Sequence, residues 1–103
     1  MLIDKKKFLK KYIFVLPVFN EEERIENTLK YYIEEVGINS EILIVDSFSK
    51  DNTKSIIKIF KNKYNFINFV EKDNNGTPET NEWISWLIKN HHSNYYIFLS
   101  CSE

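Results

Sequence analysis

The sequence predicts an α/β fold, a Rossmann-like three-layer α/β/α arrangement built on a mainly parallel four-stranded sheet. Four apolar runs alternate with three helical patterns along 103 residues, and this is the element order of α/β domains. Most of these runs are almost continuously apolar, which is typical of parallel strands covered on both faces. The predicted strands are residues 12–16, 41–45, 66–70 and 95–99.

The first predicted helix, between the first two strands, has both a start and a stop signal. Asn20 is a suitable N-cap, and Glu23 stands three residues later, where it can close a capping box. Gly37 is the residue expected just past the helix end. The apolar stripe of this helix recurs at helical spacing and consists of Ile25, Leu29, Tyr32, Ile33 and Val36.

Two further helices follow from shorter patterns. The second is expected to start after Asp51 or Asn52 and to end near residue 64, and its stripe is Ile56, Ile57, Phe60 and Tyr64. The third is expected after Pro78, with Thr77 or Thr80 as candidate caps. Its stripe is Trp83, Ile84, Leu87, Ile88 and His91.

Composition indicates one globular domain over residues 1–103. Hydrophobic residues make up 43% and charged residues 28% of the chain, which excludes disorder. A net charge of −1 argues against a general nucleic-acid binder. The apolar runs are too short to span a bilayer, the start lacks the order of a secretory signal, and one cysteine forms no internal disulfide. We therefore expect a cytoplasmic protein.

The start of the chain is basic. Lysines occupy residues 5–7 and 10–11, and such a charge run is most often a solvated lead-in. The alternative is a weak peripheral membrane contact, because apolar residues alternate with these lysines.

Ligands of open parallel sheets bind beyond the carboxyl ends of the strands. Here those positions are residues 17–20, 46–51, 72–78 and 100–103. Asp46 ends an apolar strand, and we expect it to bind a ligand, since a strand-end acid has no obvious local task. Asp51 precedes a helix, where capping is the expected role.

Other chemistry-bearing residues have plainer interpretations. His91 and His92 are adjacent, so on a helix their rings point about 100° apart and cannot chelate one metal ion. Trp83 and Trp86 are expected to pack in the core or at an interface rather than to stack on bases. Cys101 is expected to be a small buried residue, since no basic neighbour activates it.

The loops after the predicted strands resemble those of family 2 glycosyltransferases. Residues 14–23, Phe-Val-Leu-Pro-Val-Phe-Asn-Glu-Glu-Glu, resemble the opening of that family, and residues 44–53, Ile-Val-Asp-Ser-Phe-Ser-Lys-Asp-Asn-Thr, resemble its second-strand signature. Asn75-Gly76 and the strand before Ser100 match further family motifs in order.

The resemblance implies a partial A-type glycosyltransferase fold, of which this chain is the nucleotide-binding half and a fragment. It implies a UDP- or GDP-sugar donor, an acceptor that the sequence does not name, and a divalent cation, manganese or magnesium. The nucleotide-binding positions carried over from the family are Pro17, Phe19, Asn20, Glu21, Asp46, Ser47, Asp51 and Ser100. Those of the metal motif are Ser102 and Glu103.

Three departures from the family pattern set limits on this interpretation. Phe48 stands where the family usually has glycine, and the usual Ala-Arg-Asn of the third helix is missing. The metal motif reads Ser-Cys-Ser-Glu, and neutral hydroxyls are poor ligands for a hard dication. Metal binding is therefore expected to be weak in this chain.

Two alternatives remain open at this stage. The chain can be a degenerate, non-catalytic glycosyltransferase-like binding or assembly module, because serines replace acids in its metal motif. It can also be a different doubly wound protein, such as a flavodoxin-like receiver. A receiver needs an acidic pair after the first strand, but Pro17, Val18 and Phe19 stand there.

Overall fold

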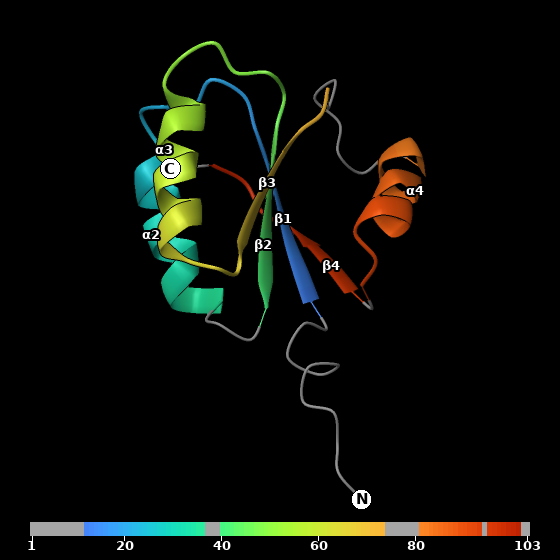
Figure 1. The fold of residues 1–103 in the computed structure, drawn as a ribbon. Coiled ribbons are helices and arrows are strands. Elements are labelled where there is room, and N and C mark those ends of the chain that lie inside the picture. The colour runs from blue at the N-terminus through green and yellow to red at the C-terminus, as the bar shows by residue number, and fades with distance from the viewer. Residues whose placement is uncertain (1–11, 37–39, 74–80, 94, 102–103) are drawn as a thin grey trace, which may run out of the picture.

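The computed structural model of the chain describes residues 12–36, 40–73, 81–93 and 95–101. Strands and helices alternate as the sequence predicts (Figure 1). The elements are β1 (Tyr12–Val18), α2 (Ile25–Val36), β2 (Glu41–Asp46), α3 (Thr53–Lys63), β3 (Ile67–Glu71), α4 (Asn81–Asn90) and β4 (Tyr95–Phe98). The predicted fold class is confirmed.

The four strands form one sheet in the order β3-β2-β1-β4, and every described pairing is parallel. In register, Val18 of β1 pairs with Asp46 of β2, and Asp46 pairs with Glu71 of β3. The carboxyl ends of these three strands are therefore level. The loops that follow β1 and β2 leave the same end of the sheet (Figure 1).

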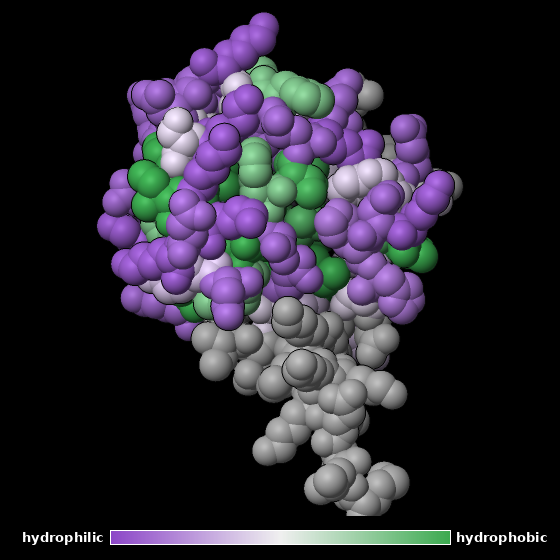
Figure 2. All heavy atoms as spheres, in the orientation of Figure 1, coloured by the Kyte–Doolittle hydropathy of each residue, from purple (hydrophilic) through white to green (hydrophobic). Residues whose placement is uncertain are grey.

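Helices cover both faces of the sheet, and this explains the continuous apolar strands. In Figure 1, α2 and α3 lie side by side on one face and α4 lies on the other. The α2–α3 side buries Leu16, Ile42 and Ile44, whereas the α4 side buries Val15 and Leu43. Figure 2 shows a largely hydrophilic surface, with hydrophobic side chains visible between the two helical layers.

The predicted start of the first helix is wrong. Residues 22–24 form a turn and α2 begins at Ile25, whose N–H donates to the Glu21 carbonyl at 2.8 Å. Asn20 has a left-handed φ of 50°, and its side chain accepts from the Lys50 N–H rather than from the helix. The capping box with Glu23 does not form, because Asn20 is engaged by a distant loop. Gly37 lies outside the described residues.

The other two helices agree better with their patterns. α3 begins at Thr53, directly after Asp51 and Asn52, as predicted. In α4, Trp83 and Leu87 are buried, but Ile84 and Ile88 are 40% and 51% exposed. The predicted stripe is thus too wide, because α4 packs on the sheet through one side only. Thr77, Pro78 and Thr80 lie outside the described residues.

No helix within the described ranges is long and apolar enough to cross a membrane.

Candidate functional site

The strand order reverses between β1 and β4. The chain runs from β1 outward through β2 to β3, and then returns to place β4 on the other side of β1. In open α/β sheets, ligands bind outside the carboxyl ends of the strands at such a reversal point. The candidate site is therefore the carboxyl edge of β1, with β2 and β4 on its two sides.

Pro17 lies in β1 at this edge. The last described β1–β4 pair is Val15 with Phe98, and the Leu99 N–H donates to the Val15 carbonyl at 2.8 Å. The backbone polar groups of successive residues in a strand point to opposite sides. The backbone of Pro17 therefore faces β4, as the backbone of Val15 does. Proline has no N–H, so Pro17 cannot donate a hydrogen bond to the β1–β4 ladder. This favours separation of the two strand ends at the reversal point.

Two loops at this edge hold each other through hydrogen bonds. We call residues 19–24 the first loop and residues 47–52 the second loop. The Asn20 N–H donates to Ser49 Oγ at 2.8 Å, and Asn20 Oδ1 accepts from the Lys50 N–H at 2.8 Å. Backbone and side chain of Asn20 thus both bond to the second loop, which fixes the path of the first loop.

A second set of bonds continues this contact toward α3. The Glu22 N–H donates to Asp51 Oδ2 at 3.3 Å, and Glu22 Oε1 accepts from the Asn52 N–H at 2.9 Å. The Glu21 N–H donates to Thr53 Oγ1 at 2.8 Å. These partners are 29 to 32 residues apart along the chain, so the bonds are tertiary contacts that join the two loops into one unit.

Asp46 is a buried residue that holds the second loop of this unit in place. Its side chain has no exposed surface. Oδ2 accepts from the Ser49 N–H at 2.7 Å, and Oδ1 accepts from the Ser49 hydroxyl. The argument that a strand-end acid has no local task is therefore wrong for Asp46, since both oxygens hold the turn after β2. Its nucleotide-binding role stays a prediction.

Asp51 holds the turn before α3, but the N-cap residue of that helix is Asn52, and no side chain makes a capping bond to it. Its Oδ1 accepts from the N–H of Thr53 at 2.9 Å and also from the Thr53 hydroxyl. Partial desolvation raises the pKa of Asp51, but the bonds from Thr53 and from the Glu22 N–H outweigh it and lower this pKa below its ordinary value. Asp51 thus acts as a turn and helix-start residue that also contacts the first loop.

Each of the two loops carries one exposed phenylalanine. Phe19 is 51% and Phe48 is 53% exposed. Phe48 has a left-handed φ of 58°, which costs a residue with a side chain on the order of 1–3 kcal/mol. The turn keeps this conformation because the neighbouring Asp46 and Ser49 are bonded to each other.

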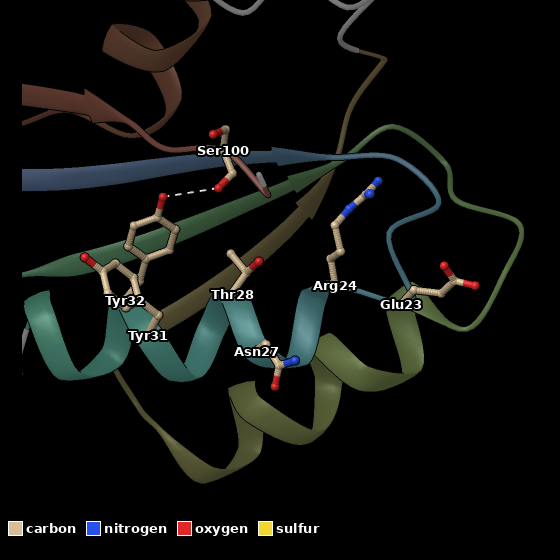
Figure 3. Close-up of a pocket in the computed structure, with 7 residues that line it drawn as sticks. All are labelled: Glu23, Arg24, Asn27, Thr28, Tyr31, Tyr32 and Ser100. Atoms are coloured by element: carbon tan, nitrogen blue, oxygen red, sulfur yellow. Dashed lines mark hydrogen bonds between the residues drawn. The ribbon is translucent and has the colours of Figure 1, made fainter. Parts of the chain in front are cut away.

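Ser100 follows the end of β4, at the same edge of the sheet as these loops. Its side chain region is exposed, and its backbone carbonyl accepts from the Tyr32 hydroxyl of α2 at 3.1 Å (Figure 3). A cavity of about 590 Å³ lies beside this contact, and it is lined by Glu23, Arg24, Asn27, Thr28, Tyr31, Tyr32 and Ser100. Arg24 is held by an ion pair with Glu21 at 2.7 Å.

The structure thus brings most of the predicted nucleotide-binding residues together at one edge. Asn20, Glu21, Asp46 and Asp51 belong to the bonded loops, while Ser100 stands at the β4 side. Ser47 continues the β1–β2 ladder, because its N–H donates to the Val18 carbonyl at 2.9 Å. Ser102 and Glu103 lie outside the described residues.

Sequence reasoning missed Ser49 and Thr53. Both are at most 4% exposed. The Ser49 hydroxyl joins Asp46, at the end of β2, to the Asn20 N–H of the first loop. The Thr53 hydroxyl joins Asp51 to the Glu21 N–H in the same way. The available signal was the alternation of acids and hydroxyl residues over 46–53, which is unusual at the end of an apolar strand.

The plainer interpretations of three other side chains are confirmed. Cys101 is buried, and burial raises the pKa of its thiol to about 11. Trp83 is 3% exposed and packs edge-on against Trp86. The Lys72 ammonium, after β3, lies 5.6 Å and 5.4 Å from the centroids of these two rings.

Comparison with solved structures shows that other proteins have this fold. S. aureus TarS (residues 1–349, in complex with UDP) has a TM-score of 0.69 at 21% identity, over 88% of this chain and 27% of TarS. The mannosyltransferase PcManGT from Pyrobaculum calidifontis, in complex with GDP-Man and Mn2+, has a TM-score of 0.53 at 18% identity, over 77% of this chain and 24% of that one. The chain thus spans about a quarter of these structures.

Sequence comparison adds a direct family assignment. No curated protein matches the chain significantly. The model of the family described as glycosyl transferase family 2 matches residues 13–81. This match begins in β1, includes both bonded loops and ends at the start of α4. It covers more than half of the chain, and the chain therefore belongs to glycosyl transferase family 2.

Proposed function

We propose that the chain binds the nucleoside-diphosphate part of a sugar donor, UDP- or GDP-linked, for transfer of the sugar to an acceptor. The observation that carries the proposal is the pair of bonded loops at the carboxyl edge of β1 and β2, next to the reversal point at β4. Family membership supports it, and the two solved relatives were crystallised with UDP and with GDP-Man.

In this proposal, different parts of the ligand bind at the ends of different strands. Neighbouring strands lie about 4.8 Å apart, so the ends of β2 and β4 are about 10 Å apart. A nucleoside diphosphate bridges a comparable distance. The base fits beside Phe19 and the second loop, where apolar rings are exposed, and the diphosphate reaches toward Ser100.

The bonded loops give this site a fixed shape before the ligand arrives. Each loop satisfies backbone N–H groups of the other, so the turn conformations do not depend on ligand contacts. A site that is already ordered loses less conformational entropy on binding. In this proposal Asp46 and Ser49 position the second loop. Because Asp46 is fully buried, a role as a direct acceptor for the base requires the turn to open and expose a carboxylate oxygen.

The family implies a divalent cation, but the described residues do not fit one. No group of three or more histidine, cysteine, aspartate or glutamate side chains in the described part of the chain could hold a metal ion. Ser100 offers a neutral hydroxyl, whereas Mg²⁺ and Ca²⁺ sites are built mainly from anionic oxygens. We therefore assign no step to a metal on the described residues.

A non-catalytic nucleotide-binding module is the second candidate function. The observation that favours it is the exposed serine, Ser100, at the β4 end where the family resemblance implies an acid. In that case the chain binds the nucleotide but does not catalyse sugar transfer. Sugar transfer by the protein in which this chain occurs decides between the two candidates.

Calorimetric titration with UDP, GDP, UDP-glucose and GDP-mannose, each with and without manganese, tests binding. We expect at least one of these ligands to bind. Phe19→Ala should lower its affinity about fivefold or more, since base–aromatic stacking contributes roughly 1–3 kcal/mol. The matched control is Ile59→Ala, because Ile59 is 65% exposed on α3 and away from the site. A folded protein that binds none of the four ligands contradicts the proposal.

A further inference from the structure

Phe48 is an unusual residue for its position in the second loop. It lies between Asp46 and Ser49, which are bonded to each other, and directly precedes Ser49. Its φ is 58°, a conformation that glycine adopts freely and phenylalanine does not. Its ring is also 53% exposed. A glycine at this position avoids both the backbone strain and the exposed apolar surface.

The surrounding bonds hold Phe48 in place. Asp46 Oδ2 accepts from the Ser49 N–H, so the chain closes a tight turn with Phe48 inside it. On the far side, the Lys50 N–H is bonded to Asn20 of the first loop. The ring therefore projects from a rigid turn, and its presentation does not come from a loop that is free to move.

The exposed rings of the described residues fall into two groups. Tyr31 and Tyr95 lie on the body of α2 and β4, whereas Phe19 and Phe48 lie in the bonded loops at the carboxyl edge. Their strands are adjacent, since Val18 pairs with Asp46. Each of two mutually bonded loops at the carboxyl edge therefore presents one exposed ring, and a flat aromatic ligand can stack on such rings.

We infer that Phe48 is a second aromatic contact for the nucleobase of the donor, in addition to Phe19, and that it helps to select nucleotides over other diphosphates. This inference rests on the proposed function. A planar base stacks on aromatic side chains whatever its hydrogen-bonding edge, so Phe48 contributes affinity for the base without distinguishing uracil from guanine by hydrogen bonds.

The test uses four variants at two positions. Phe48→Gly removes the ring and relieves the strain, Phe48→Leu keeps apolar bulk without a planar ring, and Phe48→Tyr keeps the ring. Ile59→Ala is again the control at an exposed apolar residue. Affinity for UDP and GDP is measured by calorimetry, and the base protons are followed by NMR for the upfield shift that ring stacking produces.

We expect Phe48→Gly and Phe48→Leu to lower nucleotide affinity about fivefold or more and to reduce the upfield shift. Phe48→Tyr and Ile59→Ala should bind like the unmodified protein. Phe48→Gly should at the same time raise the urea midpoint of unfolding, because the left-handed turn then fits its residue. If Phe48→Gly loses nucleotide affinity but gains stability, Phe48 contacts the ligand and does not stabilise the fold.

Two results overturn the inference, and they differ from failure of the proposed function. If Phe48→Gly binds UDP and GDP as tightly as the unmodified protein, Phe48 does not contact the base. If Phe48→Leu keeps full affinity and the upfield shift, the contact is not ring stacking. If the unmodified protein binds no nucleotide at all, the proposed function itself is wrong, and the inference falls with it.

Discussion

Ser49→Ala tests whether the buried bonds of the second loop stabilise the fold. The Ser49 hydroxyl donates to Asp46 Oδ1 and accepts from the Asn20 N–H at 2.8 Å. Ser49 is 4% exposed and Asp46 is fully buried, so water cannot replace the lost partner without opening the turn. A hydrogen bond to a charged group contributes about 1.5–3 kcal/mol, and we expect a loss of that size in the free energy of unfolding.

Urea denaturation is the assay. With a slope of about 1–3 kcal/mol per molar urea, the expected loss of about 1.5–3 kcal/mol lowers the midpoint by about 0.5 to 3 M. The matched control is Ser55→Ala, an identical substitution at an exposed position of α3, where alanine should be neutral or slightly stabilising. If the two variants unfold within about 0.5 kcal/mol of each other, the bonded-loop argument is refuted. Asp46→Asn combined with Ser49→Ala should cost less than the sum of the single changes, because both remove the same contact.

Three further predictions concern other parts of the chain. The pKa of Asp51 is lowered in the folded protein. Its contribution to stability is therefore present above its unfolded pKa of about 3.9 and is lost as pH falls through the folded value. In acid titrations, Asp51→Asn should lose less stability below about pH 4 than the unmodified protein. Cys101, with its pKa raised to about 11, should react with iodoacetamide at pH 8 roughly a hundredfold more slowly in the folded than in the urea-unfolded protein. Leu87→Ala should cost about 2–5 kcal/mol in urea unfolding and Ile88→Ala much less, since Leu87 is 1% and Ile88 is 51% exposed; equal costs would mean that α4 packs differently.

The strands could be predicted closely because their signal is local. β2 was expected over residues 41–45 and spans Glu41–Asp46, and β4 was expected over 95–99 and spans Tyr95–Phe98. Runs of β-branched and aromatic residues bounded by polar ones give the position of a buried parallel strand directly. The helix α3 was predictable for a similar reason, since Asp51 bonds to Thr53 within the same turn.

The start of α2 could not be predicted from its local sequence. Asn20 fits an N-cap by its own chemistry, but its side chain accepts from the Lys50 N–H, 30 residues away. This tertiary contact replaces the local bond, and the sequence around Asn20 contains no sign of which loop lies opposite. Asp46 differs, because its partner Ser49 is only three residues away, so the hydroxyl residues that follow the strand were a local signal for its role.

The bonded loops also explain why residues that resemble family motifs need not be ligand contacts. Asn20, Asp46 and Asp51 all belong to those motifs, yet each uses its side-chain oxygens to bond backbone N–H groups of the chain itself. Their oxygens are therefore largely committed before a nucleotide arrives. If the proposed function holds, we expect the exposed rings of Phe19 and Phe48 to face the nucleotide instead. It follows that substitutions at Phe19 and Phe48 should change nucleotide affinity without loss of stability, whereas substitutions at the motif residues should lower stability first.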